Sequence, residues 1–438
     1  MPHHPSVYSA IRQEVYDWRL WASRGVVLAF AALAGLTVVV FTWMTEHALA
    51  LFSEFENKFW WGPLLWTPAA TAAIVWLTRR YAAGAAGSGI PQVMAALTPE
   101  VPKACVNLYV SLRLAFAKMV LATGGLLAGL SLGREGPSVQ IAAGVLHHAR
   151  RWLPRQSQVS EHGLLMAGGA AGIAAAFNTP LGGVMFAIEE LSRKPEQRNS
   201  GLLLAAIVLA GLMAVSVYGN STYFGVIRVE NLSWALLLPG VLVAVCSGLA
   251  GGLFARLLQV SLAGLSGDGF SRFRQHSPVR FAALCGLAVA VLGVVSHGDT
   301  YGSGYTHTRD MLEGKGDASG LYVLLKFLAT WITAWAGVPG GLFAPSLAIG
   351  GALGNDIAQL TAYANAPTLI ALGMAGFLAA VTQAPLTAFI IVMEMVDGHA
   401  LVLSLMGSAL IASGVSRLIS APLYSSLAQL QIRRLPQT

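Results

Sequence analysis

A stretch of 19 residues from Val26 to Met44 contains no charged side chain. A helix of that length and apolar character can cross the hydrocarbon core of a bilayer. The composition extends the conclusion to the whole chain, because 55% of its 438 residues are hydrophobic and only 11% are charged. In lipid, a helix satisfies all of its backbone polar groups internally. We therefore expect an all-α polytopic membrane protein.

Several of the other apolar segments are too short, or too often interrupted by Gly, Pro and polar residues, to be simple spans. Interrupted helices are tolerated at membrane depth only where protein buries them or where they line a cavity. This pattern favours a transporter or channel over a bundle of anchors. The segments lie near 60–77, 163–177, 201–218, 232–254, 281–296, 321–337, 369–380 and 401–412.

One short motif, Gly133-Arg134-Glu135-Gly136-Pro137, places a carboxylate directly after a strongly apolar run. An ionisable group at membrane depth is expensive, and it usually marks an ion or proton pathway. Glycine lets the backbone approach a ligand closely, and Pro137 suits the first position of a new helix, where its missing N–H costs nothing. The motif therefore predicts a broken helix that points its positive N-terminal end, and Glu135, at an anion.

The second half of the chain repeats the first. The segment that begins at Pro137 resembles the one that begins at Pro345, an offset of 345 − 137 = 208. The segment around Pro180 resembles the one around Pro385, an offset of 385 − 180 = 205. Repeats that are broken at corresponding positions are typical of transporters whose site lies where the halves meet. We expect one transmembrane domain over 25–428, with halves of about 25–220 and 230–428.

Residues outside that domain are expected to be peripheral. Helical spacing of apolar residues predicts a cytoplasmic surface helix over 1–24, and 429–438 reads as a short basic tail. Arginines gather at the ends of apolar segments, as the positive-inside rule requires, with both termini cytoplasmic. The net charge of +7 therefore needs no nucleic-acid partner. We expect the three cysteines to be inert, and no metal or cofactor site is predicted.

Three motifs in order resemble the signatures of the CLC family of chloride channels and proton/chloride antiporters. They are Gly87-Ser88-Gly89-Ile90-Pro91, the Glu135 motif and Gly341-Leu342-Phe343-Ala344-Pro345, and Pro422-Leu423-Tyr424-Ser425 follows them. The resemblance implies an inverted repeat of broken and tilted helices. It implies a homodimer in which each subunit has its own pathway. It is closest to bacterial members without CBS domains, which implies a multi-pass protein of the bacterial inner membrane.

The resemblance also implies roles for single residues. Glu135 matches the gating glutamate, which accepts protons and competes with chloride, and Glu190 matches an internal proton-transfer glutamate. Lys118 matches a buried lysine near the anion path. The chloride-binding positions are the hydroxyls of Ser88 and Tyr424 and backbone N–H groups: those of Leu342 and Phe343 at a central site, Gly136 and Ala344 further out, and Gly87 and Ser88 further in.

Other interpretations of these residues remain open. Ser88 would also serve as a helix N-cap, and Tyr424 as an interfacial aromatic residue. Glu190 would look the same in a solvated cluster with Arg193 and Lys194. Arg134 is expected to be structural and paired with a carboxylate other than Glu135. Glu394, which lies opposite Glu189 in the repeat, is expected to be structural, with a buried arginine as a possible partner.

The leading functional prediction is secondary active exchange of chloride for protons, with chloride as substrate and no cofactor. The alternative on the same fold is a passive voltage- or pH-gated chloride channel. Channels of the family commonly keep the gating glutamate and replace the internal one, so a glutamate at 190 favours exchange. An enzyme is not expected, because no His-Glu-x-x-His or Gly-x-Ser-x-Gly pattern is present in a suitable context.

Overall fold

The computed structural model describes residues 17–155, 157–191, 200–219, 222–225, 234–264, 268–315 and 320–433. All named elements in these ranges are helical. Six described segments are long and apolar enough to cross a membrane, which agrees with the predicted polytopic fold. They are Trp18–Lys58, Lys103–Leu127, Gly201–Tyr218, Trp234–Ala263, Pro278–Val295 and His399–Arg417.

The described residues of the first half form nine α-helices. The first of these described helices contains 41 residues, which corresponds to a length of about 61 Å and is twice the thickness of a bilayer core. That helix must therefore tilt or project beyond the core. The helices are α2 (Trp18–Lys58), α3 (Pro63–Tyr81), α4 (Ile90–Leu97), α5 (Val106–Tyr109), α6 (Leu112–Leu127), α7 (Glu135–His148), α8 (Glu161–Phe177), α9 (Pro180–Phe186) and α10 (Ser200–Tyr218).

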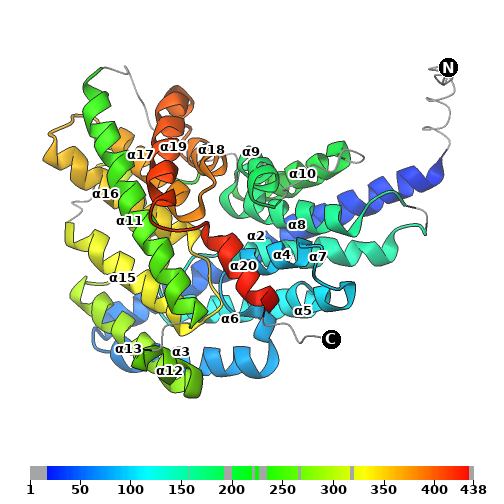
Figure 1. Cartoon of the computed structure of the whole chain (residues 1–438), viewed down its shortest axis with the longest axis horizontal. Coiled ribbons are helices and arrows are strands. Elements are labelled where there is room, and N and C mark those ends of the chain that lie inside the picture. The colour runs from blue at the N-terminus through cyan, green and yellow to red at the C-terminus, as the bar shows by residue number, and fades with distance from the viewer. Residues whose placement is uncertain are drawn as a thin grey trace.

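The second half follows nearly the same order and ends with one additional helix. In Figure 1, α7 to α10 gather on one side of the molecule and α15 to α19 on the other, while α20 crosses the front against α4. The helices are α11 (Leu237–Ala263), α12 (Gly269–His276), α13 (Pro278–Val295), α14 (Tyr305–Leu312), α15 (Gly320–Ala336), α16 (Phe343–Leu360), α17 (Ala366–Thr382), α18 (Pro385–Met395), α19 (Val402–Arg417) and α20 (Leu423–Arg433).

The two ends of the chain differ in detail from the expected boundaries. The expected surface helix over 1–24 lies mostly outside the described residues. Its last residues, from Trp18 onward, form the start of α2, which continues without a break past residue 24. At the other end, 429–433 belong to α20, and the remainder of the expected tail lies outside the described residues.

Reciprocal contacts relate the two halves by an approximate two-fold axis. The Gly133 amide donates to the Gly341 carbonyl at 2.8 Å, and the Gly341 amide donates to the Gly133 carbonyl at 2.7 Å. A contact in which each partner presents the same groups to the other is the mark of a two-fold relationship. Asn178 and Gln383, 205 residues apart, end α8 and α17 in the same left-handed conformation, with φ of 57° and 60°. The predicted repeat is therefore present in the fold.

Small residues bring the helices around this axis into close contact. A methyl group added at Gly168 of α8 would lie 2.7 Å from Ala143 Cα of α7. Gly350 of α16 and Gly373 of α17 approach each other so closely that neither could carry a side chain. Without a hydrophobic driving force in lipid, such close backbone packing is a main source of helix association. The motif-bearing helices α7 and α16 are thereby buried along almost their whole length.

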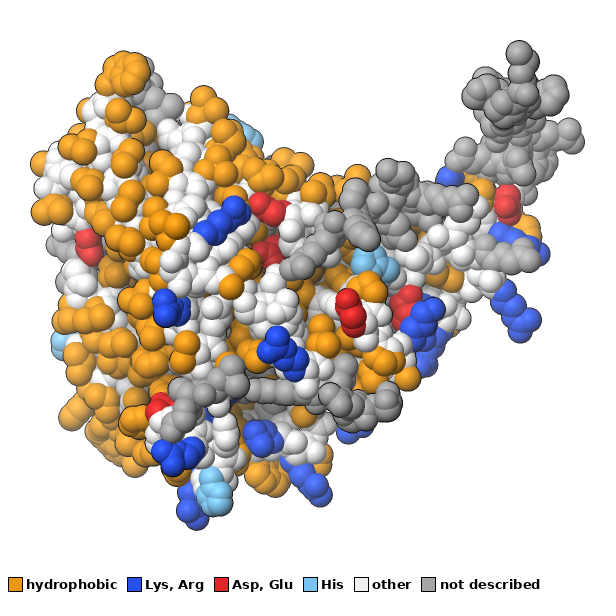
Figure 2. Space-filling model, in the orientation of Figure 1, with side chains coloured by type: hydrophobic (Ala, Val, Ile, Leu, Met, Phe, Trp, Pro, Cys, Tyr) orange, Lys and Arg blue, Asp and Glu red, His pale blue; other side chains and the backbone are white. Residues whose placement is uncertain are grey.

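The outer surface carries the large apolar side chains. Leu33, Val40, Trp43 and Leu51 on α2 are each at least half exposed. Figure 2 shows hydrophobic side chains dominating one edge of the face that carries α20, with Lys and Arg side chains spread over other parts of that face. This distribution fits helices whose outer faces contact lipid and whose basic ends meet water.

Candidate functional site

Two helix N-termini meet at the centre of the molecule. α7 begins at Glu135 and α16 begins at Phe343, and the reciprocal pair of hydrogen bonds between Gly133 and Gly341 joins the turns that precede them. The first amides of a helix have no partner within it, and the helix dipole makes that end positive. Two such ends facing a shared space form a site for an anion.

The Glu135 side chain occupies part of that space. It is fully buried, and neither carboxylate oxygen makes a hydrogen bond of normal geometry, although the amides of Arg134 and Ala344 lie close enough to interact with it. The side chain folds back over Gly133, where an added methyl group would collide with Glu135 Oε2 and lie 3.2 Å from both Ala344 Cβ and Pro345 Cδ. The Glu135 carboxyl group therefore lies beside the N-terminal ends of both α7 and α16.

A third turn and the last helix complete the site. Ser88, 7% exposed, lies in the turn before α4, and a methyl group at Gly136 would collide with its Oγ. Tyr424 of α20 is 1% exposed, and its ring stacks on Phe343 with centroids 5.9 Å apart. The Tyr424 and Ser88 hydroxyls approach each other, yet Ser88 Oγ makes no hydrogen bond of normal geometry. The Ser88 hydroxyl therefore has hydrogen-bonding capacity that no described residue uses with normal geometry.

Lys118 stabilises the backbone of the turn that contains Ser88. Its Nζ is fully buried and donates to the carbonyls of Ala85, at 2.8 Å, and Gly87. The Gly87 carbonyl also accepts from the Gly340 amide at 3.0 Å, which ties this turn to the third motif. Lys118 therefore acts through the backbone of the turn, and its recorded partners are carbonyls.

Sequence reasoning missed that this arrangement is repeated. Gly302-Ser303-Gly304 precedes α14 as Gly87-Ser88-Gly89 precedes α4, and all four glycines have positive φ. Lys326, 326 − 118 = 208 residues after Lys118, is also fully buried and donates to carbonyls, including that of Gly302 at 2.8 Å. The offset of 208 already linked Pro137 to Pro345, so it would have identified this pair.

Two glutamates related by the repeat each bind the start of a helix in the other half of the chain. Glu189 accepts from the amides of Leu386 (3.1 Å) and Thr387 (2.6 Å) at the start of α18. Glu394 accepts in the same way from Leu181 (3.2 Å) and Gly182 (2.7 Å) at the start of α9. Glu394 is structural, as expected, but its recorded partners are helix amides and not a buried arginine.

Glu190 lies next to Glu189 in a π-helical segment, η4 (Ala187–Leu191). It is partly exposed, which places it between the interior and the surface. It is also close enough to Tyr424 to act on it electrostatically. Arg193 and Lys194, its alternative partners, lie outside the described residues.

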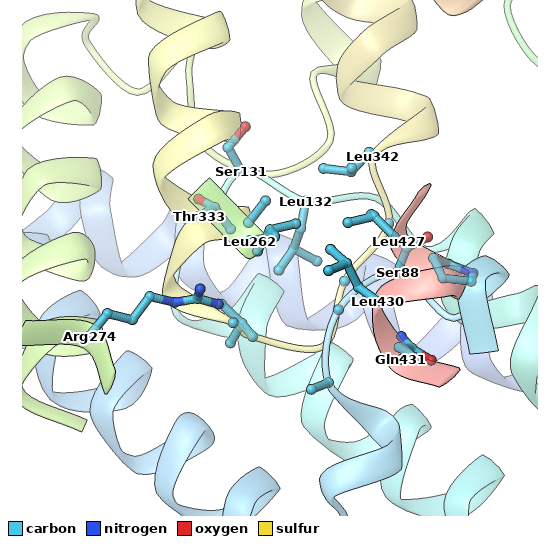
Figure 3. Close-up of a pocket in the computed structure, with 18 residues that line it drawn as sticks. Ser88, Ser131, Leu132, Leu262, Arg274, Thr333, Leu342, Leu427, Leu430 and Gln431 are labelled. Carbon is cyan, nitrogen blue, oxygen red and sulfur yellow. The ribbon is translucent and has the colours of Figure 1, made fainter. Parts of the chain in front are cut away.

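Two cavities reach the site, and we call them inner and outer after the inner and outer anion positions that the family resemblance implies. The inner one has a volume of about 150 Å³ and reaches Ser88 and Leu342, as Figure 3 shows, with Leu427 and Leu430 of α20 beside them. The outer one has a volume of about 280 Å³ and reaches Glu135. The two lining sets share no residue, so the buried segment with Glu135, Ser88 and Tyr424 lies between them.

Sequence reasoning missed one charged residue in each cavity, Arg274 in the inner one and Glu46 in the outer one. Arg274 of α12 reaches into the inner cavity (Figure 3) and donates to the Ser261 carbonyl at 3.0 Å. In the outer cavity Arg134 pairs with Glu46 of α2 at 2.7 Å. That pair confirms that Arg134 has a partner other than Glu135. Sequence could not identify the partner, because the two residues are 88 positions apart.

Comparisons with known proteins agree with this geometry. The profile of the family described as "Voltage gated chloride channel" matches residues 70–417. An "H(+)/Cl(-) exchange transporter ClcA" of Citrobacter koseri is 30% identical over 419 residues, covering 90% of this chain and 85% of the relative. The protein of the same name from Cronobacter sakazakii is 31% identical over 427 residues, covering 90% and 86%.

Solved structures show the same fold. A slow cyanobacterial Cl⁻/H⁺ antiporter matches with a TM-score of 0.81 and 25% identity, covering 95% of this chain and 98% of the other. A CLC-type fluoride/proton antiporter matches with a TM-score of 0.75 and 23% identity, covering 94% and 98%. The second likeness concerns the fold alone.

Proposed function

The chain belongs to the voltage-gated chloride channel (CLC) family, whose members are transporters and channels of anions and not enzymes, and on this premise we propose that it exchanges chloride for protons. The observation that carries the proposal is the position of Glu135. A buried carboxylate between two helix N-termini must leave, or become protonated, before an anion can take its place. Proton and anion occupancy are then linked reciprocally.

Chloride is the proposed anion because the donors are neutral. The hydroxyls of Ser88 and Tyr424, with the amides of Leu342 and Phe343, supply partial positive charge without a full cation contact. Such donors replace water around chloride and still permit release. Gly136 and Ala344 are proposed to serve an outer anion, and Gly87 with Ser88 an inner one. Pro137 also supports chloride. The motif that it closes resembles the one in chloride-transporting members of the family, whereas the fluoride-exporting branch differs from the motif at this proline.

Glu190 is proposed as the internal proton-transfer group. Its partial exposure and its electrostatic reach to Tyr424 support a step between the inner solution and the buried site. A passive chloride channel is the alternative on this fold. The retention of a glutamate at 190, together with exchangers among the relatives, favours coupled exchange.

A homodimer in a bacterial inner membrane is the proposed assembly. Leu181, Ile188, Leu386, Leu403 and Leu410 are all more than a third exposed and lie on the cross-paired helices of the two halves or next to them. Such a surface suits either a second copy or lipid. Bacterial relatives support the location, and the basic side chains on the face with α20 support cytoplasmic termini.

The decisive experiment uses purified protein in liposomes and a chloride gradient as the only driving force. Exchange predicts that the flow of chloride down its gradient drives protons in the opposite direction, measured with a pH electrode. Glu135→Gln is expected to abolish proton movement and to leave chloride flux, because an amide cannot carry the proton. Chloride flux without proton movement in the wild-type protein would replace the exchanger with the channel.

A further inference from the structure

Glu46 lies at the outer approach to the gate. Its Oε1 contacts Arg134 Nη1 at 2.7 Å, and Arg134 Nη2 donates to the Tyr223 hydroxyl at 3.2 Å. The Glu46 side chain is 51% exposed, whereas the Arg134 side chain is 12% exposed. The guanidinium is therefore fixed in the wall, and the carboxylate is the partner that can move away.

Both residues line the outer cavity that reaches Glu135. Among the described residues that line it, Arg134 is the only cation, and the only anions are Glu46 and Glu135. An arginine retains its charge at all physiological pH values and is a suitable first contact for an anion that enters from this side. In this structure the Glu46 carboxylate pairs with Arg134 and takes the position of an entering anion.

We propose that Glu46 is a tethered competitor for the transported anion, holding Arg134 until an anion arrives and so setting the apparent affinity on the outer side. The inference rests on the proposed transport of chloride and adds a second carboxylate further out than Glu135. Glu135 occupies the buried segment, whereas Glu46 controls loading of the cavity before it.

The strength of the pair suits this role. Because the Glu46 side chain is half exposed, water competes for its carboxylate and weakens the pair, so an anion at ordinary concentrations can displace it. Replacing Glu46 by the isosteric glutamine keeps the size of the side chain and removes the competing charge. Arg134 would then be free to bind chloride, and the external concentration at half-maximal rate should fall about two- to fivefold.

The experiment measures chloride flux in liposomes that hold the protein in one orientation, at constant ionic strength. Glu46→Gln should lower the half-saturating concentration for external chloride and leave that for internal chloride unchanged. Glu56→Gln is the matched control, because it removes the same charge from α2 about 15 Å further along the helix. That distance exceeds the screening length at physiological salt. Glu56→Gln should therefore leave both constants unchanged.

A double-variant cycle separates competition for Arg134 from a general change in surface charge. In an Arg134→Gln background, Glu46→Gln should have no effect on external chloride. Tyr223→Phe, which removes the neutral partner of Arg134, should shift the external constant less than Glu46→Gln does.

An unchanged external constant in Glu46→Gln would overturn the inference, as would an equal shift in Glu56→Gln. Persistence of the Glu46→Gln effect without Arg134 would also overturn it. Absence of chloride flux in the wild-type protein would overturn the proposed function and this inference together.

Discussion

Replacing Lys118 by methionine tests whether the buried lysine supports the anion site through the backbone of the Ser88 turn. Methionine has nearly the same length and is apolar, so the variant removes only the donor. The Ala85 carbonyl loses its 2.8 Å partner, whereas the Gly87 carbonyl retains the bond from Gly340. One buried carbonyl is thereby left without its donor.

The magnitude follows from that count. A buried carbonyl without a partner costs about 1–3 kcal/mol. If roughly half of this cost appears as displacement of the Ser88 turn, chloride binding loses about 0.5–1.5 kcal/mol. A loss of that size corresponds to an affinity about 2- to 10-fold weaker. Titration calorimetry of chloride into detergent-solubilised protein measures it directly.

The symmetric lysine supplies the matched control. Lys326→Met removes a buried donor from the equivalent turn at Gly302, which lies before α14 and away from Ser88. Because Lys326 donates to the carbonyls of Thr300, Tyr301 and Gly302, the change should destabilise the protein at least as much, measured by thermal unfolding, and leave chloride affinity unchanged. Unaltered affinity in Lys118→Met, or an equal loss in both variants, would refute the backbone role of Lys118.

Three further predictions concern the site and its frame. Glu190→Gln should stop proton uptake while chloride still moves, because an amide does not titrate; parallel pH and chloride electrodes record both, and unchanged coupling would assign proton entry to another group. Ser88→Pro should raise nitrate flux relative to chloride, because proline removes the hydroxyl proposed to donate to chloride; an unaltered ratio of the two fluxes would leave Ser88 as a helix cap alone. Glu394→Gln removes the charge from two amide contacts and should lower the free energy of unfolding by about 1–2 kcal/mol, measured by thermal unfolding, without changing the exchange ratio.

The motifs predicted the positions of the helix breaks well, because each break depends on local chemistry. Glycine and proline fix where a helix stops and the next begins, and α7 begins at Glu135, within the motif that predicted a broken helix. The repeat was also within reach, since similar turns need similar residues in both halves. The predicted all-helical membrane fold and the CLC family are both confirmed.

Long-range partners were not predictable from one sequence. Glu46 is one of three glutamates on α2, and only folding brings it to Arg134. For Glu394 the sequence suggests a buried arginine as a possible partner, because it does not show that the amides of Leu181 and Gly182 lie against the carboxylate. The boundary expected at residue 24, between a surface helix and the membrane domain, is absent because α2 runs through it. Arginine and tryptophan suit a surface helix and the end of a spanning helix equally well, so composition could not separate the two.

The crossed carboxylates have a consequence for synthesis of the protein in the cell. The Gly182 amide cannot form its bond to Glu394 until that residue, 212 positions later, has been synthesised. At about 5–20 residues per second, roughly 10–40 s pass before its partner leaves the ribosome. During that interval the start of α9 is incomplete and the first half of the anion site faces no counterpart. The first half must therefore remain in the membrane as an unfinished unit, and this is the period in which a chaperone or a second nascent chain can bind it.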